Sequence, residues 1–387
     1  MTHSIMVPGF KPHGGKHCET TAANHVLRYQ GIELSEELLF GLGGGIGFIY
    51  WYMKKMNAPL VGGRAGGRDF NLIDNILRRI GGSTEVLTTG SSKKAYDWLI
   101  DDLKRGEPVI CYGDMAYLPY FGVGEDEHFG GHVFVVYGVD SELDRVWIAD
   151  GGTEPFFVTR GNLEQSRGSK HPPFPPHNMM IRVHAPQRCS ELGPGILESV
   201  QGCITGMREA PIANIGIKGM GKWAAQVRKW PGQFPGRGFV DCLMSTFLYI
   251  EVGGTGGSAF RSMYATFLRE AADITGIVEY RKAAELYDRC AEQWKTIAYS
   301  ALPNDVDVLR RCRELLFERD ELMENNGPNT VELARDANRR IATAIEDAVA
   351  GLTSEQTAHI VEDLQGKILA LRDLEQAALD GLAKAVA

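Results

Sequence analysis

The stretch HVFVVYGVDSELDRVWIAD, residues 132–150, decides the fold class of the N-terminal half. β-Branched and aromatic residues fill its two ends, and the polar segment 140–144 separates them, which is typical of two β-strands joined by a tight turn. Strands joined in this way run antiparallel, so the start of one lies beside the end of the other. The pairing therefore predicts that His132 and Asp150 meet across the hairpin.

Periodicity outside the hairpin predicts further elements on both sides of it. Helical spacing of apolar residues indicates helices over 18–30, 35–42, 69–80 and 91–105. Strand-like composition indicates strands over 108–113, 155–159 and 178–184. Helices followed by antiparallel strands make an α+β domain, which we assign to residues 1–190. Beyond residue 200 the pattern is helical, and Thr353 and Gln356 are spaced as a capping box. We expect a second, mostly α-helical domain over 200–387.

The composition excludes several classes of protein. The 387 residues carry a formal net charge of -8 without a Lys/Arg cluster, which argues against a nucleic-acid partner. No run approaches the roughly 18 apolar residues that span a bilayer, and the start lacks the apolar segment of a signal peptide, so we expect no membrane association and a cytoplasmic location. The seven cysteines are scattered and form no CxxC pair, which argues against a disulfide framework or a zinc ribbon.

Cys18 is the candidate nucleophile. The expected helix 18–30 places it at a helix N-terminus, where the macrodipole favours the thiolate. A buried structural cysteine is the common alternative, but the polar, glycine-containing context GKHCETTAAN is typical of a site wall. His132 is the expected base and Asp150 the group that orients its ring. The alternatives are a histidine that merely starts a strand and an aspartate that forms a turn.

Longer segments of the sequence carry a family resemblance. GKHCETTAANHVLRYQGIELSEELLFGLGGGIGFIY (15–50) and GGHVFVVYGVD (130–140) resemble the butirosin-biosynthesis BtrH N-terminal family. The region from MREAPIANIG (207–216) to EVGGTGGSAFRSMYATFLREAADITG (251–276) resembles the helical domain of unknown function that commonly follows it. The resemblance implies a papain-like, cysteine-peptidase-type fold and acyl transfer from an acyl-carrier-protein thioester to an amine. It also implies Cys18 as nucleophile, His132 as base and Asp150 as the third member of the triad.

Acyl transfer also needs hydrogen-bond donors for the oxyanion of the tetrahedral intermediate. Papain-like enzymes use a glutamine shortly before the cysteine, and this sequence has none there. The backbone N–H of Cys18 is one candidate donor. The side chains of His13 and His17 are two others, although a packing role is the alternative for His17.

Two glycine-rich segments are candidates for substrate binding. In GLGGGIG (41–47), Gly44 and Gly45 would let the backbone approach a substrate, or would form a flexible loop. The second segment places Glu251, Arg261 and Tyr264 around a helix start where an anion such as a pantetheine phosphate would bind; tight helix packing is the alternative.

His128 has the spacing of a zinc pair with His132, but the intervening Phe-Gly-Gly discourages the helix that would align them. We expect no metal.

The expected reaction is ping-pong acyl transfer through a Cys18 acyl-enzyme, with the helical domain as a cover that excludes water. The expected partners are an acyl carrier protein and a small-molecule amine. No bound cofactor is expected, since the phosphopantetheine arm enters as substrate. A hydrolase (peptidase or thioesterase) and an intramolecular amide-forming cyclase use the same triad and stay open, as do a non-catalytic carrier-binding module and a homo-oligomeric state.

Overall fold

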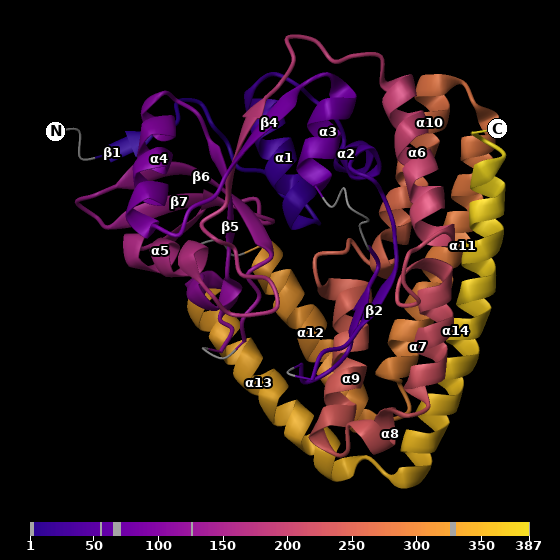
Figure 1. Ribbon diagram of the computed structural model, residues 1–387. Coiled ribbons are helices and arrows are strands. Elements are labelled where there is room, and N and C mark those ends of the chain that lie inside the picture. Colours follow the sequence, from indigo (N-terminus) through magenta and orange to yellow (C-terminus); the bar gives the residue numbers. More distant parts are fainter. Residues whose placement is uncertain (1–3, 55, 65–70, 125–126, 326–329, 387) are drawn as a thin grey trace. The chain divides into compact units, whose positions relative to one another are not determined.

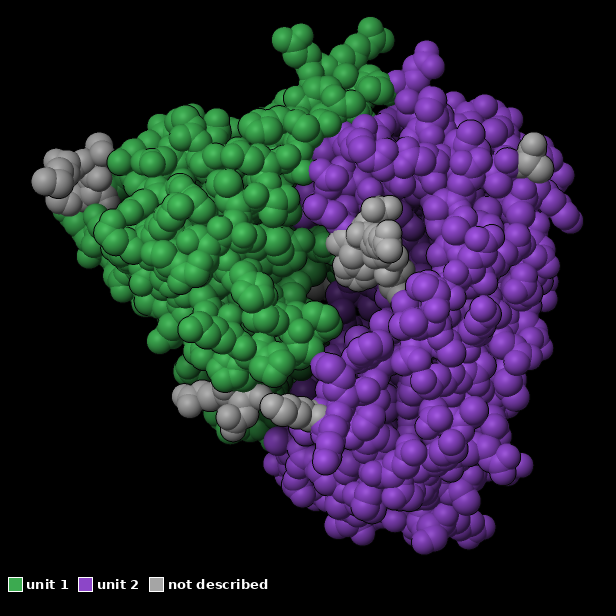
Figure 2. Space-filling view, in the orientation of Figure 1, with its two compact units in different colours: residues 1–36, 80–190, 318–339 green, residues 37–79, 191–317, 340–387 purple. Residues whose placement is uncertain are grey.

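The computed structural model describes residues 4–54, 56–64, 71–124, 127–325 and 330–386, which form two compact units (Figures 1 and 2). Unit 1 comprises residues 1–36, 80–190 and 318–339, and unit 2 comprises residues 37–79, 191–317 and 340–387. The chain passes between the units near residue 190, where we placed the end of the first domain. It also passes between them near residues 36, 79, 317 and 339, so the units differ from the contiguous domains 1–190 and 200–387.

Unit 1 contains an antiparallel sheet of strand order β4-β9-β5-β6-β7-β8, with β1 paired to β6. Its strands are β1 (Ser4–Met6), β4 (Ser83–Leu87), β5 (Val109–Gly113), β6 (His132–Asp140), β7 (Arg145–Ala149), β8 (Phe156–Val158) and β9 (Met180–His184). The α+β class is thereby confirmed, while the papain-like assignment stays a prediction. β1 and β4 were not predicted from the sequence, because they are short and largely exposed.

The hairpin of β6 and β7 confirms the antiparallel pairing expected for residues 132–150. Asp140 pairs with Arg145 next to the turn, and Val135 pairs with Ala149 at the other end. The register shifts between Val136 and Gly138, an irregularity of the kind that a β-bulge produces. β6 is buried along nearly its whole length, which explains its continuous apolar composition.

Three helices of unit 1 accompany the sheet: α1 (Cys18–Tyr29), α4 (Ser92–Lys104) and α5 (Arg160–Gly168). α1, whose first residue is Cys18, packs against β5 and β6 of the sheet. Ser91 is the N-cap of α4, and its hydroxyl accepts a hydrogen bond from the Lys94 amide at 3.2 Å. This confirms the expected helix start.

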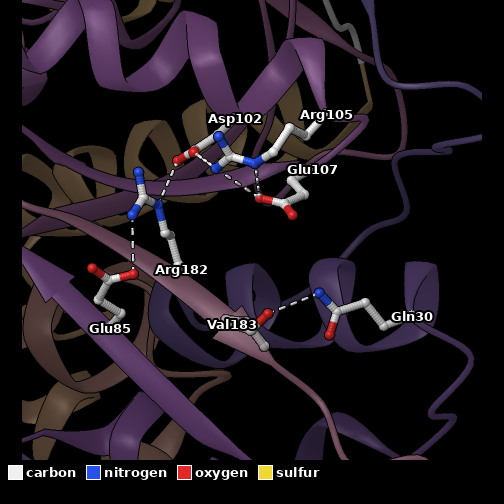
Figure 3. Close-up of polar contacts among 7 residues, drawn as sticks. All are labelled: Gln30, Glu85, Asp102, Arg105, Glu107, Arg182 and Val183. Atoms are coloured by element: carbon white, nitrogen blue, oxygen red, sulfur yellow. Dashed lines mark hydrogen bonds and ion pairs between the residues drawn. The ribbon is translucent and has the colours of Figure 1, made fainter.

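Polar contacts tie the elements of unit 1 together (Figure 3). Arg182 on β9 donates to the buried Asp102 of α4 at 2.9 Å and to Glu85 of β4 at 3.0 Å. The side-chain amide of Gln30, the C-cap of α1, donates to the Val183 carbonyl of β9 at 2.9 Å. The C-terminal end of the Cys18 helix is thereby fixed to a sheet strand.

Unit 2 is mainly helical. It contains α2 (Glu36–Leu42) except its first residue, α3 (Leu72–Ile80) except its last residue, α6 (Leu192–Arg208), α7 (Gly216–Val227), α8 (Trp230–Gln233), α9 (Arg237–Phe247), α10 (Arg261–Thr275), α11 (Val278–Ala301), α14 (Ser354–Ala383), most of α12 (Asp307–Asn325) and part of α13 (Thr330–Gly351). The capping box of Thr353 and Gln356 is confirmed at the start of α14. Within the described residues, no helix combines the length and apolarity needed to cross a membrane.

The segment 37–79 belongs to unit 2 because its apolar side chains enter the helical core. It contains the two-stranded sheet of β2 (Ile49–Trp51) and β3 (Leu60–Gly62). Phe48 stacks on Trp223 at 5.8 Å between ring centroids, and the Tyr50 hydroxyl accepts a hydrogen bond from Trp230 at 3.0 Å. Burial of such large aromatic surfaces is the main stabilising contribution to a core of this kind.

Candidate active site

Cys18, His132 and Asp150 lie together in unit 1 (residues 1–36, 80–190 and 318–339). Cys18 is the first residue of α1, and its thiol lies close enough to the imidazole of His132, the first residue of β6, to contribute to the pKa of that ring. The Nε2 atom of His132 lies 2.7 Å from Oδ2 of Asp150, which directly follows β7. Since Asp150 occupies Nε2, Nδ1 is the ring nitrogen left for Cys18.

Asp150 is held by three donors. Its Oδ2 accepts from His132 and from the Tyr120 hydroxyl at 2.8 Å, and its Oδ1 accepts from the Gly151 amide at 2.8 Å. These bonds orient the carboxylate, and a fixed carboxylate fixes the plane and tautomer of the imidazole that it contacts.

The electrostatics favour a charged pair. Burial disfavours a charge on His132, which is 7% exposed, but the charges and hydrogen bonds of Asp150 and Cys18 outweigh it and raise the pKa of His132 above its ordinary value. Burial likewise acts to raise the pKa of Asp150, yet His132, Tyr120 and the Gly151 amide lower it. Imidazolium and carboxylate therefore stabilise each other.

An aromatic wall surrounds the His132 ring. The Phe121 ring meets it edge-on at 4.9 Å between centroids, and Tyr120 stacks on Phe156 at 4.3 Å. Tyr120 and Phe121 belong to the short 3-10 helix η2 (Pro119–Phe121), which ends at Gly122 with a φ of +61°. A Cβ on Gly122 would lie 2.6 Å from the Arg335 amide, so this close contact requires glycine.

The segment 318–339 backs this wall. The side-chain amide of Asn338 on α13 donates to the carbonyls of Phe121 at 3.2 Å and Gly122 at 2.8 Å. A helical segment distant in sequence thus supports the loop that contacts the His132 ring. This contact could not be predicted from the sequence, because local periodicity indicates a helix and not the surface against which the helix packs.

The two candidate oxyanion histidines have other partners. The His13 ring stacks on that of His25 at 4.0 Å between centroids, and its Nδ1 lies 3.1 Å from the Gly14 carbonyl. His17 is buried, with Nδ1 3.2 Å from the Thr20 hydroxyl. The oxyanion role of both side chains stays a prediction. The amide of Cys18 is the first of α1, so it has no intrahelical acceptor.

His25 is a histidine close to the site that the sequence analysis did not select. Burial and the neighbouring His13 lower the pKa of His25 to about 3, so the ring is neutral at pH 7. Its Nε2 accepts a hydrogen bond from the His13 amide at 3.0 Å, which leaves the proton of the neutral ring on Nδ1.

Arg261, which was predicted to bind substrate, is enclosed within unit 2. The side chain is 0% exposed, and its guanidinium donates to Glu375 at 2.6 Å and to the carbonyls of Gly63, Ala259 and Gly47 at 2.7 to 2.8 Å. These contacts join β3, α10 and α14, and leave no exposed donor for a ligand. These contacts favour packing, which was the alternative interpretation of its segment, and the substrate role of Arg261 stays a prediction.

The remaining predicted substrate residues also lie in unit 2. Tyr264 is 0% exposed, and Gly45, with a φ of +62°, packs so closely on its ring that a Cβ would lie 2.5 Å from Cε2. Tyr264 and Gly45 thus pack against each other, and their substrate roles stay predictions. Glu251 accepts from the Ser258 amide at 3.2 Å, and Gly44 has a φ of +123° with open space around its Cα; their substrate roles stay predictions.

Family models match most of the chain. Residues 17–151 match the model described as Butirosin biosynthesis protein H, N-terminal. Residues 161–316 match Domain of unknown function (DUF4872). The chain has the BtrH-like architecture. Comparison with curated proteins gives no match.

The BtrH-like region, residues 17–151, contains all three members of the triad geometry and ends one residue after Asp150. The match to the domain of unknown function contains Glu251, Arg261 and Tyr264. Among the residues that the structure describes, no group of three or more His, Cys, Asp and Glu side chains is arranged to hold a metal ion.

Proposed function

We propose that this protein is an acyltransferase that moves an acyl group from a phosphopantetheine thioester through a Cys18 acyl-enzyme to an amine. The observation that carries the proposal is the placement of His132 between the Cys18 thiol and the Asp150 carboxylate. Nucleophile, base and orienting acid in that order are the arrangement that cysteine acyl transfer requires. The BtrH-like match supports a natural-product biosynthetic context.

In the first half-reaction His132 holds the proton of Cys18, and the thiolate attacks the thioester carbonyl. The tetrahedral oxyanion accepts a hydrogen bond from the Cys18 amide at the start of α1, where the helix dipole favours negative charge. The intermediate collapses, the pantetheine thiolate leaves, and His132 returns the proton to it. The product is a thioester on Cys18.

In the second half-reaction an amine attacks the Cys18 thioester, and His132 takes the proton that the amine loses. Collapse forms the amide and releases Cys18. Exchange of one thioester for another is nearly isoenergetic and amide formation is downhill, so the sequence of steps needs no nucleotide hydrolysis. The acyl donor in this proposal is an acyl carrier protein, and the acceptor is a small molecule with a free amine.

Intact mass spectrometry tests the proposal. The protein is incubated with an acyl-pantetheine thioester, and the adduct is mapped by peptide mass before and after addition of an amine. We expect one acyl group on Cys18, its transfer to the amine, and no adduct in Cys18→Ala. Cys189→Ala is the matched control, because Cys189 is another partly exposed thiol.

Undiminished acylation of Cys18→Ala would refute the assignment of the nucleophile. Release of free acid at the same rate with and without amine would instead identify a hydrolase, and release of a ring without any amine would identify a cyclase.

A further inference from the structure

Glu36, the first residue of α2, makes an unusual number of contacts with the segment around Cys18 within unit 1. Its Oε1 accepts from the backbone amides of Lys16 at 3.0 Å and His17 at 2.9 Å. The same carboxylate oxygen accepts from the hydroxyls of Thr20 at 2.9 Å and Thr21 at 3.1 Å. Its Oε2 lies 3.0 Å from the Lys16 amide. One side chain therefore holds backbone and side-chain donors on both sides of Cys18.

The start of α1 explains why such a contact is needed. The N-cap position is occupied by His17, whose side chain makes no capping hydrogen bond to the first turn. Ser, Thr, Asp and Asn normally provide that bond, and a helix start without it is less well fixed. Glu36 instead links the two amides before the helix to two hydroxyls of its first turn.

We infer that Glu36 is a positioning residue for Cys18: it fixes the turn before the helix against its first turn, so that the thiol stays aligned with His132 and the Cys18 amide stays available for the oxyanion. This inference rests on the proposed function. Acyl transfer depends on this alignment, whereas alkylation by a small reagent requires only the thiolate. A residue that merely stabilises the loop would affect both reactions alike, or neither.

The geometry also predicts which property of Glu36 matters. Four of the five contacts are made by Oε1 and only one by Oε2. In Glu36→Gln the amide oxygen can occupy the position of Oε1 and keep these four contacts, while the negative charge is lost. Glu36→Asp keeps the charge on a side chain that is one methylene shorter. Glu36→Ala removes every contact.

The experiment compares two rates for Cys18 in each variant: acylation by an acyl-pantetheine thioester and alkylation by iodoacetamide, both followed by intact mass. We expect the acylation rate of Glu36→Ala to fall about 10²-fold, the scale of a misplacement of about 1 Å, while alkylation changes little. Glu36→Gln should recover most of the acylation rate, and Glu36→Asp should fall between the two. Glu33→Gln is the matched control, because Glu33 is an exposed carboxylate three residues earlier.

Equal loss of acylation and alkylation, or normal acylation in Glu36→Ala, would overturn the inference. If Glu36→Ala does not fold, Glu36→Asp carries the test, and an unchanged ratio of the two rates in that variant overturns it as well. A wild-type protein whose Cys18 is alkylated but never acylated would refute the proposed function itself.

Discussion

Replacement of Asp150 by Asn tests the pair that orients His132. Both oxygens of the carboxylate accept hydrogen bonds: Oδ2 accepts from His132 and Tyr120, and Oδ1 accepts from the Gly151 amide. An asparagine has one oxygen and one NH₂ group, so either orientation of its amide places a donor against a donor. The variant keeps the shape of the side chain, loses the negative charge, and no longer favours the tautomer with a proton on Nε2.

The loss can be sized from the contact that disappears. A hydrogen bond to a charged group contributes about 1.5 to 3 kcal/mol, which corresponds to a roughly 10- to 100-fold slower acylation. The pH dependence has a defined sign. Burial alone lowers the pKa of His132, and Asp150 is the main charge that raises it, so the pKa falls in the variant. The imidazolium is then lost at lower pH, and the high-pH limb of the acylation profile moves to lower pH.

The assay is the initial rate of Cys18 acylation between about pH 6 and pH 10, measured by intact mass, since histidine normally titrates near pH 6.5. Asp140→Asn is the control, because Asp140 ends β6 of the same hairpin but its side chain binds the turn amides of Glu142 and Leu143. A high-pH limb that stays in place in Asp150→Asn, together with a wild-type rate, would refute the role of Asp150.

Two further substitutions follow from the contacts. Tyr120→Phe removes one of the two donors to Asp150 Oδ2, so we expect acylation to slow about tenfold, the equivalent of about 1.5 kcal/mol for a hydrogen bond to a charged group; a wild-type rate would show that the hydroxyl does not act on the site. Arg261→Ala leaves the Glu375 carboxylate buried without the guanidinium that neutralises it, so the free energy of unfolding in urea should fall by about 3 to 5 kcal/mol. The exposed Arg281→Ala is the control and should cost less than about 1 kcal/mol. Unchanged stability of Arg261→Ala together with weaker saturation by the thioester would support a ligand role for Arg261.

The parts of the fold that depend on local pattern were predictable. The hairpin 132–150 is apolar at both ends and polar at its turn, so its pairing follows from composition and spacing alone. The proximity of His132 and Asp150 depends on this pairing, and the 2.7 Å separation of Nε2 and Oδ2 agrees with it despite the irregular register near Gly138. The helix start at Cys18 and the cap at Ser91 are likewise local signals.

The parts that depend on distant contacts were not predictable. Glu36 occurs in the polar start of an ordinary amphipathic helix, and nothing in its neighbourhood indicates that its carboxylate binds the turn before Cys18. Arg261 follows glycine-rich residues in a pattern typical of an anion site, whereas its partner Glu375 lies 114 residues away. A buried ion pair and a ligand-binding arginine have the same local sequence, and only the packing distinguishes them.

The interleaved composition of the two units has a consequence for biosynthesis of the polypeptide. On the ribosome, residues 1–190 emerge before the Asn338 side chain that binds the carbonyls of Phe121 and Gly122. Unit 1 therefore cannot reach its final form co-translationally until the chain has grown past residue 339, by which time most of the helical unit has also left the exit tunnel. A polypeptide that ends at residue 190 would contain Cys18, His132 and Asp150 but would lack the helical segment that supports the aromatic wall. It would also expose the apolar residues of 37–79 that belong to the helical core.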